Sequence, residues 1–208
     1  MTDFKDLNII GLTGMSGAGK SAAARVFAEN GFLVIDCDKE AKRIIAKPPC
    51  SYGVKRAFPQ AYDENGEFNK VKMARIVFSN EAELKRYEKI VFPYIVHGII
   101  KNILCQAEKG RRNFLLDAPT LFQSGADDLC GGIIAVVSEK EICAERIMER
   151  DKISEEDALL RLDSQPDAGF YEEKASCLII NNGTYEEFLK NINEIIKNPC
   201  SINEMFRF

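Results

Sequence analysis

The sequence predicts a three-layer α/β/α fold, with helices on both faces of a five-stranded parallel sheet. Five short apolar segments alternate with stretches of helical periodicity, which is typical of parallel sheets. A glycine-rich turn joins the first apolar segment directly to the first helical stretch. At 208 residues, the chain suits a single domain with small insertions.

The first strand and helix are predicted on either side of that turn. Asn8–Thr13 is a short run with β-branched residues, and Lys20–Asn30 has helical periodicity. Gly31 suits the end of the helix, because glycine readily adopts the left-handed conformation found there.

A second strand is predicted at Phe32–Ile35. It leads to Asp36 and Asp38, where a helical pattern begins and continues through Ile45. If the extended geometry persists past the strand, the two carboxylates point the same way, because alternate residues share a face. Asp38 is then expected at the carboxyl end of this strand.

Residues 50–109 contain no convincing strand pattern, and they are predicted to form a helical insertion. Prolines and a turn dipeptide are expected to interrupt its helices. The predicted interruptions are Pro48-Pro49, Pro59, Asn65-Gly66 and Pro93.

Three further strands are predicted at Asn113–Asp117, Gly132–Val137 and Cys177–Ile180, each followed by a helical pattern. The last helix is expected over residues 184–197, with residues 198–208 as a loosely attached tail. Ligands of parallel sheets bind beyond the carboxyl ends of the strands, so a site is expected there.

The glycine-rich turn reads Gly14-x-x-x-x-Gly19-Lys20-Ser21, which is the pattern of a phosphate-binding P-loop. In such a loop, backbone N–H groups and the helix N-terminus face the phosphates, the lysine reaches the β- and γ-phosphates, and the serine binds Mg²⁺. An incidental glycine-rich turn is the alternative, but the flanking strand and helix favour a P-loop. The candidate nucleotide-binding residues are Gly14, Ser16, Gly17, Ala18, Gly19, Lys20, Ser21 and Ala22.

Two strand-end carboxylates are candidates for the chemistry. Asp117 is positioned either to hold Mg²⁺ together with Ser21 or to serve as an ordinary loop residue. Asp38 is positioned either to align an acceptor hydroxyl and take its proton or to cap a helix beginning at Lys39. The residue pattern alone leaves both alternatives open.

A helical lid is predicted where two arginine-bearing helices break at Asp151-Lys-Ile-Ser154. Ser154 and Asp157 have the spacing of a capping box. Arg150 is the candidate for contacting transferring phosphate oxygens on closure, and Arg146 is a candidate nucleotide contact. The alternative is that these arginines and Arg161 pair with acidic neighbours on solvated faces. Those neighbours are Glu145, Glu149, Glu155 and Asp163.

The composition and charge of the chain argue against several classes of protein. A net charge of −4 argues against sequence-independent nucleic-acid binding. We find no apolar run of bilayer length and no secretory signal at the N-terminus, so a soluble, cytoplasmic protein is expected. The seven cysteines form no C-x-x-C pair and are expected to be free, buried thiols rather than zinc ligands. His97 is expected to be a partly buried helix residue rather than a catalyst.

Taken together, the motifs resemble those of the dephospho-coenzyme A kinase family, from about Ile9 to Ile196. They are Ile10-Gly-Leu-Thr-Gly14, Gly17-Ala-Gly-Lys-Ser21, Val34-Ile-Asp-Cys-Asp38, Asp117-Ala-Pro-Thr-Leu-Phe122, Arg146-x-x-x-Arg150-Asp151, Arg161-x-x-x-Gln165 and Ile179-Ile-Asn-Asn-Gly183.

The resemblance implies that ATP, with Mg²⁺, phosphorylates the ribose 3′-hydroxyl of dephospho-coenzyme A. It implies catalytic roles for Asp38, Lys20 and Arg150. It also implies a P-loop core formed by residues 1–40, 110–150 and 173–197, a dephospho-coenzyme A region at 41–109 and a lid at 151–172.

Three positions depart from the family pattern. Phe92 replaces the usual histidine before Pro93, and it can neither donate nor accept that hydrogen bond. His97 lies five residues further along the predicted helix and points away from the direction of position 92. Ala22 and Gln123 replace a threonine and a glutamate.

Other functions remain compatible with the sequence. Another small P-loop kinase, acting on a nucleoside, nucleotide or alcohol, would share the core. A nucleotide-binding relative that has lost turnover is a second possibility, which Phe92 keeps open. A GTP-binding switch would need an Asn-Lys-x-Asp segment, and Asn69-Lys-Val-Lys72 lacks the acid. The sequence leaves the oligomeric state undecided, and a monomer is compatible with it.

Overall fold

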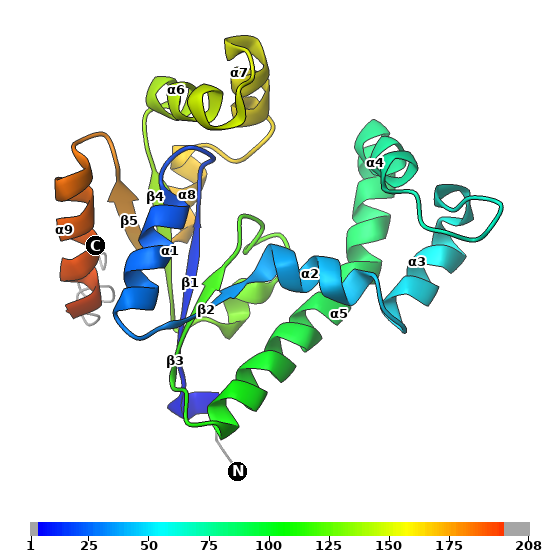
Figure 1. Cartoon of the computed structure of the whole chain (residues 1–208), viewed down its shortest axis with the longest axis horizontal. Helices are drawn as coiled ribbons and strands as arrows, with labels where there is room; N and C mark the ends of the chain where they lie inside the picture. The colour runs from blue at the N-terminus through cyan, green and yellow to red at the C-terminus, as the bar shows by residue number, and fades with distance from the viewer. Residues whose placement is uncertain (1–3, 198–208) are drawn as a thin grey trace. The chain divides into compact units, whose positions relative to one another are not determined.

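The computed structural model describes residues 4–197 and shows one five-stranded parallel sheet (Figure 1). The spatial order is β2-β3-β1-β4-β5, and every neighbouring pair is parallel. The predicted α/β fold with five strands is therefore confirmed. The strands are β1 Asn8–Gly14, β2 Leu33–Asp36, β3 Asn113–Asp117, β4 Gly132–Val137 and β5 Cys177–Ile180.

The chain divides into two compact units. One comprises the chain up to Asp36 and from Ala107 onward, and it contains the sheet. Helices α1 and α9 of this unit lie against each other, and α8 packs on β4 and β5 (Figure 1). Its helices are α1 Lys20–Glu29, α6 Lys140–Asp151, α7 Glu155–Asp163, α8 Ala168–Lys174 and α9 Tyr185–Lys197, with 3₁₀ turns at Phe4–Asp6 and Ala126–Leu129.

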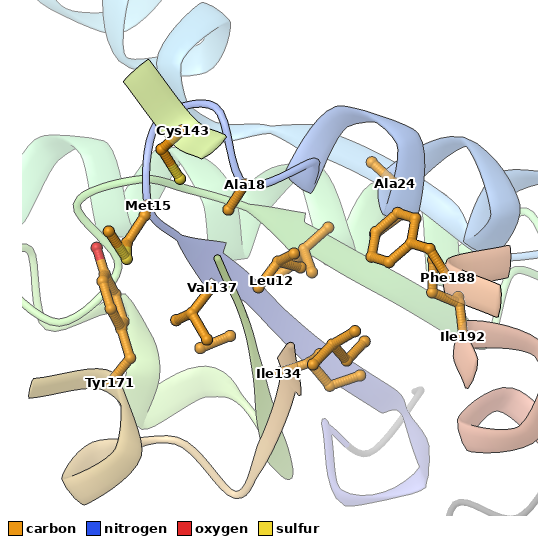
Figure 2. Packing of buried hydrophobic residues seen from close by; sticks show 14 of the residues in the cluster. Leu12, Met15, Ala18, Ala24, Ile134, Val137, Cys143, Tyr171, Phe188 and Ile192 are labelled. Atoms are coloured by element: carbon orange, nitrogen blue, oxygen red, sulfur yellow. The ribbon is translucent and has the colours of Figure 1, made fainter. Parts of the chain in front are cut away.

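The apolar core of this unit lies on the central strands. Leu12 of β1 and Ile134 of β4 are fully buried, because these central strands are covered by a cluster that includes residues of α1 and α9. Figure 2 shows Phe188 and Ile192 of α9 beside Ala24 of α1 in the same cluster. The last residues of β1 and β4 are also buried, so the strand ends from which the loops begin are firmly packed.

The second unit, Cys37–Gln106, contains helices and no strand of the sheet. In α5 every fourth residue of one stripe is buried, from Val91 through Ile95 and Ile99 to Ile103, which is the spacing of a single helix face. The helices are α2 Cys37–Ile45, α3 Cys50–Ala57, α4 Lys70–Ser79 and α5 Glu81–Glu108, with a 3₁₀ turn at Pro59–Ala61.

The expected interruption at Pro93 is wrong. Pro93 lies inside α5, a helix of 28 residues. Proline removes one backbone donor and one helical hydrogen bond, but the long flanking turns keep the helix in register. The element is continuous in Figure 1 and changes direction along its length, as helices that contain proline do.

The boundary at Asp38 also differs from expectation. β2 ends at Asp36 and α2 begins at Cys37, so Asp38 lies in the first helical turn. The extended geometry does not persist from Asp36 to Asp38, and Asp38 is not a cap preceding a helix at Lys39. Cys37, the first residue of α2, is buried.

Three further expectations need correction: one about apolar runs of bilayer length and two about the burial of side chains. Helix α5 is long and apolar enough to cross a membrane by length and composition, so an apolar stretch of that length does exist. His97 is exposed rather than partly buried. Among the six cysteines that the structure describes, all are free, but Cys105 is exposed; Cys200 lies outside the described residues.

Candidate active site

The P-loop lies between β1 and α1. Gly14 has a φ of 140°, and a Cβ there would collide with the backbone of Val136 on the adjacent strand. Gly19, the N-cap of α1, has a φ of 108°, and its Cβ would lie 2.6 Å from the Asn181 amide nitrogen. Only glycine fits these positions, so the loop is fixed by its backbone.

Lys20 and Asp117 form an ion pair at the carboxyl edge of the sheet. Asp117 ends β3, where it lies opposite Leu12 of β1, and Lys20 begins α1. Both side chains are 18% exposed, so the pair lies in a recess rather than in open solvent. The P-loop lysine and the strand-end carboxylate are therefore held together.

The donor set around this pair suits Mg²⁺. Ser21 lies in the first turn of α1 with an exposed side chain, and it would supply a hydroxyl oxygen. Asp117 would supply carboxylate oxygen. Hard oxygen ligands of this kind, with phosphate oxygens completing the set, are those that Mg²⁺ takes.

Asn181 supports the loop from the other side. This residue follows β5, is 7% exposed, and donates from Nδ2 to the carbonyl of Ala18 at 2.7 Å. Its own backbone N–H bonds the carbonyl of Val137. Asn181 stands in the Ile179-Ile-Asn-Asn-Gly183 motif, but its role could not be predicted, because the contact joins residues 163 positions apart in the chain.

Two further side chains reach the loop. Arg146 of α6 donates from Nη1 to the carbonyl of Gly17 at 3.4 Å, so this candidate contact lies at the P-loop. Gln165, two residues after α7, accepts a hydrogen bond from the Ser16 N–H at 3.1 Å. Gln165 likewise stands in a motif, Arg161-x-x-x-Gln165, that does not reveal this contact.

Arg150, the candidate for contacting the transferring phosphate, is hydrogen-bonded to Asp151 in this structure. Its guanidinium donates two hydrogen bonds to Asp151 at 2.8 Å, and Arg161 donates to the same carboxylate at 2.6 Å. These bonds, first the one from Arg150, lower the pKa of Asp151 to about 2. The arginines thus pair with Asp151 and not with the acidic neighbours that the sequence suggested; Asp163 pairs with Lys140.

The structure shows one half of the predicted capping box after this hinge, the cap that Ser154 places on α7. The Ser154 hydroxyl accepts a hydrogen bond from the Asp157 N–H at 3.2 Å and donates to the Asp157 carboxylate at 2.8 Å. Helix α7 therefore begins where the sequence indicated.

The remaining candidates are more open. Asp38 is exposed in the first turn of α2, within the Cys37–Gln106 unit. Of the positions that depart from the family pattern, Phe92 is half-buried in α5, Ala22 is half-buried and Gln123 is exposed.

The Cys37–Gln106 unit contains a cavity of about 650 Å³. Helices α2, α3 and α4 line it together with Tyr87 of α5, and Lys42, Lys55 and Lys70 stand around it. Burial raises the pKa of Tyr87 to about 12, and Lys55 lies 5.3 Å from the centre of the Tyr62 ring. The cavity is therefore apolar with a cationic margin. Its other aromatic lining residues are Tyr52, Phe68 and Phe78.

A family model described as "Dephospho-CoA kinase" matches residues 8–187. The chain belongs to the dephospho-CoA kinase family. Its relatives include the Fusobacterium nucleatum dephospho-CoA kinase, at 35% identity over 88% of this chain and 94% of the relative. The Arabidopsis thaliana dephospho-CoA kinase is 32% identical over 97% of this chain and 89% of the relative.

Solved structures agree with this membership. The dephospho-CoA kinase from Campylobacter jejuni superposes with a TM-score of 0.67 and 27% identity, over 92% of this chain and 96% of that one. A shikimate kinase from Acinetobacter baumannii, with a TM-score of 0.53 and 18% identity, shares the fold. Membership makes the chain an ATP-using kinase and a soluble enzyme of coenzyme A biosynthesis.

Proposed function

We propose the residue roles by which this chain carries out the reaction of its family. The chain transfers the γ-phosphoryl group of ATP to the ribose 3′-hydroxyl of dephospho-coenzyme A, giving coenzyme A and ADP, the last step of coenzyme A biosynthesis. The observation that carries the nucleotide side of this assignment is the Lys20–Asp117 pair beside a P-loop in which Gly14 and Gly19 admit no side chain. The acceptor comes from the family match over residues 8–187.

The P-loop residues from Gly14 to Ala22 bind the polyphosphate. Backbone N–H groups and the N-terminus of α1 hold the phosphate oxygens, and Lys20 leaves Asp117 to contact the β- and γ-phosphates. Arg146 keeps the loop in place through the Gly17 carbonyl. These groups offset the charge that spreads over the transferring phosphoryl oxygens.

Ser21 and Asp117 would hold Mg²⁺. When bound, the ion neutralises charge on the β- and γ-phosphate oxygens. Asp117, which partners Lys20 in this structure, would supply one oxygen to the ion, and Lys20 would contact the nucleotide.

Asp38 aligns the 3′-hydroxyl and accepts its proton as transfer proceeds. This role comes from the match of Asp38 to the family's catalytic aspartate, and a carboxylate is the group that phosphoryl transfer to an alcohol needs. Its place in the first turn of α2 gives it a fixed backbone.

Residues 41–109 receive the acceptor, and the apolar cavity among α2, α3 and α4 takes its pantetheine arm. An apolar cavity of this volume suits an extended organic chain. The lysines at its margin suit the pyrophosphate from which that arm extends. Residues 151–172 act as the lid, bringing Arg150 to the phosphates on closure, and the enzyme works in the cytoplasm.

The acceptor is tested by ADP release from ATP and Mg²⁺ with a panel of alcohols. We expect release with dephospho-coenzyme A and only background rates with adenosine or shikimate. Faster release with either of the latter would assign the chain to another small P-loop kinase. Nucleotide binding without turnover on any acceptor would indicate a relative that has lost activity.

A further inference from the structure

Gln165 connects the segment after α7 to the phosphate loop. Its Oε1 accepts a hydrogen bond from the Ser16 N–H at 3.1 Å, although the two residues are 149 positions apart. Ser16 is one of the candidate nucleotide-binding residues of the P-loop. The side chain of Gln165 therefore ends at the rim of the polyphosphate site.

The backbone of Ser16 fixes which end of the amide faces the loop. A backbone N–H is a donor, and of the two ends of a carboxamide only the oxygen accepts. A flipped amide would bring two donors together, so Oε1 must face Ser16 and Nε2 must point elsewhere.

Nε2 of Gln165 is buried and has no hydrogen-bond partner among residues 4–197. It is the single buried side-chain nitrogen or oxygen in the described part of the chain of which this is true. Burying an amide donor without an acceptor is unfavourable, and native structures rarely retain one without a protein, water or ligand acceptor to satisfy it. Because Ser16 holds the other end of the same amide, an acceptor that reaches Nε2 has to lie close to the P-loop.

We propose that Gln165 is a nucleotide-contacting residue, whose Nε2 donates a hydrogen bond to a phosphate oxygen of ATP held in the loop. Ser16 locks the amide in the orientation that presents this donor. A phosphate oxygen is an acceptor and carries negative charge, which strengthens the bond. The inference rests only on the nucleotide-binding part of the proposed function and not on the identity of the acceptor.

The test compares Gln165→Glu and Gln165→Leu by calorimetric titration with ADP and a non-hydrolysable ATP analogue, without acceptor. Gln165→Glu keeps an oxygen for Ser16 but places a carboxylate where the donor was. We expect both variants to bind at least one of the two nucleotides about tenfold more weakly or worse, as for loss of a hydrogen bond to a charged group. The glutamate variant should be the weaker binder.

Thermal melting separates this role from a structural one. Without nucleotide, Gln165→Leu loses the hydrogen bond from Ser16 together with the buried unsatisfied donor, two opposing effects, so it should melt close to the wild-type temperature. With nucleotide, its stabilisation should be smaller. Ser164→Ala, whose hydroxyl bonds the Arg161 carbonyl instead, is the matched control and should bind as wild type does.

Wild-type affinity for both nucleotides in both Gln165 variants would overturn the inference. So would a lower melting temperature without nucleotide combined with unchanged nucleotide binding. Because these titrations contain no acceptor, they stand or fall separately from the reaction assigned above.

Discussion

The two units form their candidate binding sites in different ways. In the unit with the sheet, the phosphate loop is held by buried, long-range hydrogen bonds, such as that from Asn181 to Ala18. It is also held by glycines such as Gly14, which packs so closely on the backbone of Val136 that no side chain fits. In the Cys37–Gln106 unit, the cavity is lined by side chains, and Tyr52 and Phe78 in that lining are 69% and 80% exposed. The proposed donor site is thus built on fixed backbone that carries the Lys20 side chain, whereas the proposed acceptor site is built on replaceable side chains.

This contrast is tested most strongly at Lys20. Lys20→Met removes the cation that meets the phosphates, and we expect kcat/KM to fall by about 10³. Steady-state kinetics with both substrates would measure it. Arg25→Met, on the exposed side of the same helix, is the control and should stay near wild type. A loss below tenfold for Lys20→Met would remove the lysine from the mechanism.

Asp38 tests the acceptor side of the reaction. Asp38→Asn keeps the shape but loses the proton acceptor, so we expect kcat to fall about 10²-fold with the Kd for ATP unchanged. Glu40→Gln, in the same turn of α2, is the matched control. Equal losses in kcat and ATP affinity would indicate that Asp38 is structural.

The cavity should respond to added bulk alone. Ala74→Trp projects into the lining, and we expect the KM for dephospho-coenzyme A to rise about tenfold while the KM for ATP is unchanged, since one well-placed contact is worth about 1–3 kcal/mol. Val71→Trp, on the same helix but outside the lining, is the control. A rise in both KM values would argue against separate donor and acceptor sites.

The smallest effect is expected at the hinge before α7. The folded pKa of Asp151, about 2, lies below its ordinary value of 3.8, so its pairs with Arg150 and Arg161 stabilise the fold above pH 3.8. That stabilisation is lost as pH falls through about 2. The melting temperature of wild type minus that of Asp151→Asn should be constant from pH 7 to 5 and shrink below pH 4. A difference that grows on acidification would contradict the ion pairs.

Local patterns predicted the strands well. Asn113–Asp117, Gly132–Val137 and Cys177–Ile180 have the predicted bounds, because buried apolar runs between turn residues leave little choice. Pro93 was misleading because a long helix tolerates the loss of one hydrogen bond. The position of Asp38 was misjudged because α2 follows β2 directly at Cys37, and local patterns do not fix a helix start to the residue.

The P-loop contacts were predictable only in part. Gly14 to Ser21 form a local motif that fixes the loop. The amides of Gln165 and Asn181 reach the loop through hydrogen bonds spanning 149 and 163 residues, which no local pattern contains. Both residues stand in motifs of the family pattern, which indicates that they matter, but only the folded chain shows what they contact.

The central claim is transfer of the terminal phosphoryl group of ATP to dephospho-coenzyme A. It is tested most directly by incubating the purified protein with ATP labelled in the γ-phosphate, Mg²⁺ and dephospho-coenzyme A, and locating the label by mass spectrometry. We expect one labelled coenzyme A per ADP, with the label on the ribose 3′-phosphate. Label released as inorganic phosphate, or ADP formed equally without dephospho-coenzyme A, would contradict the account.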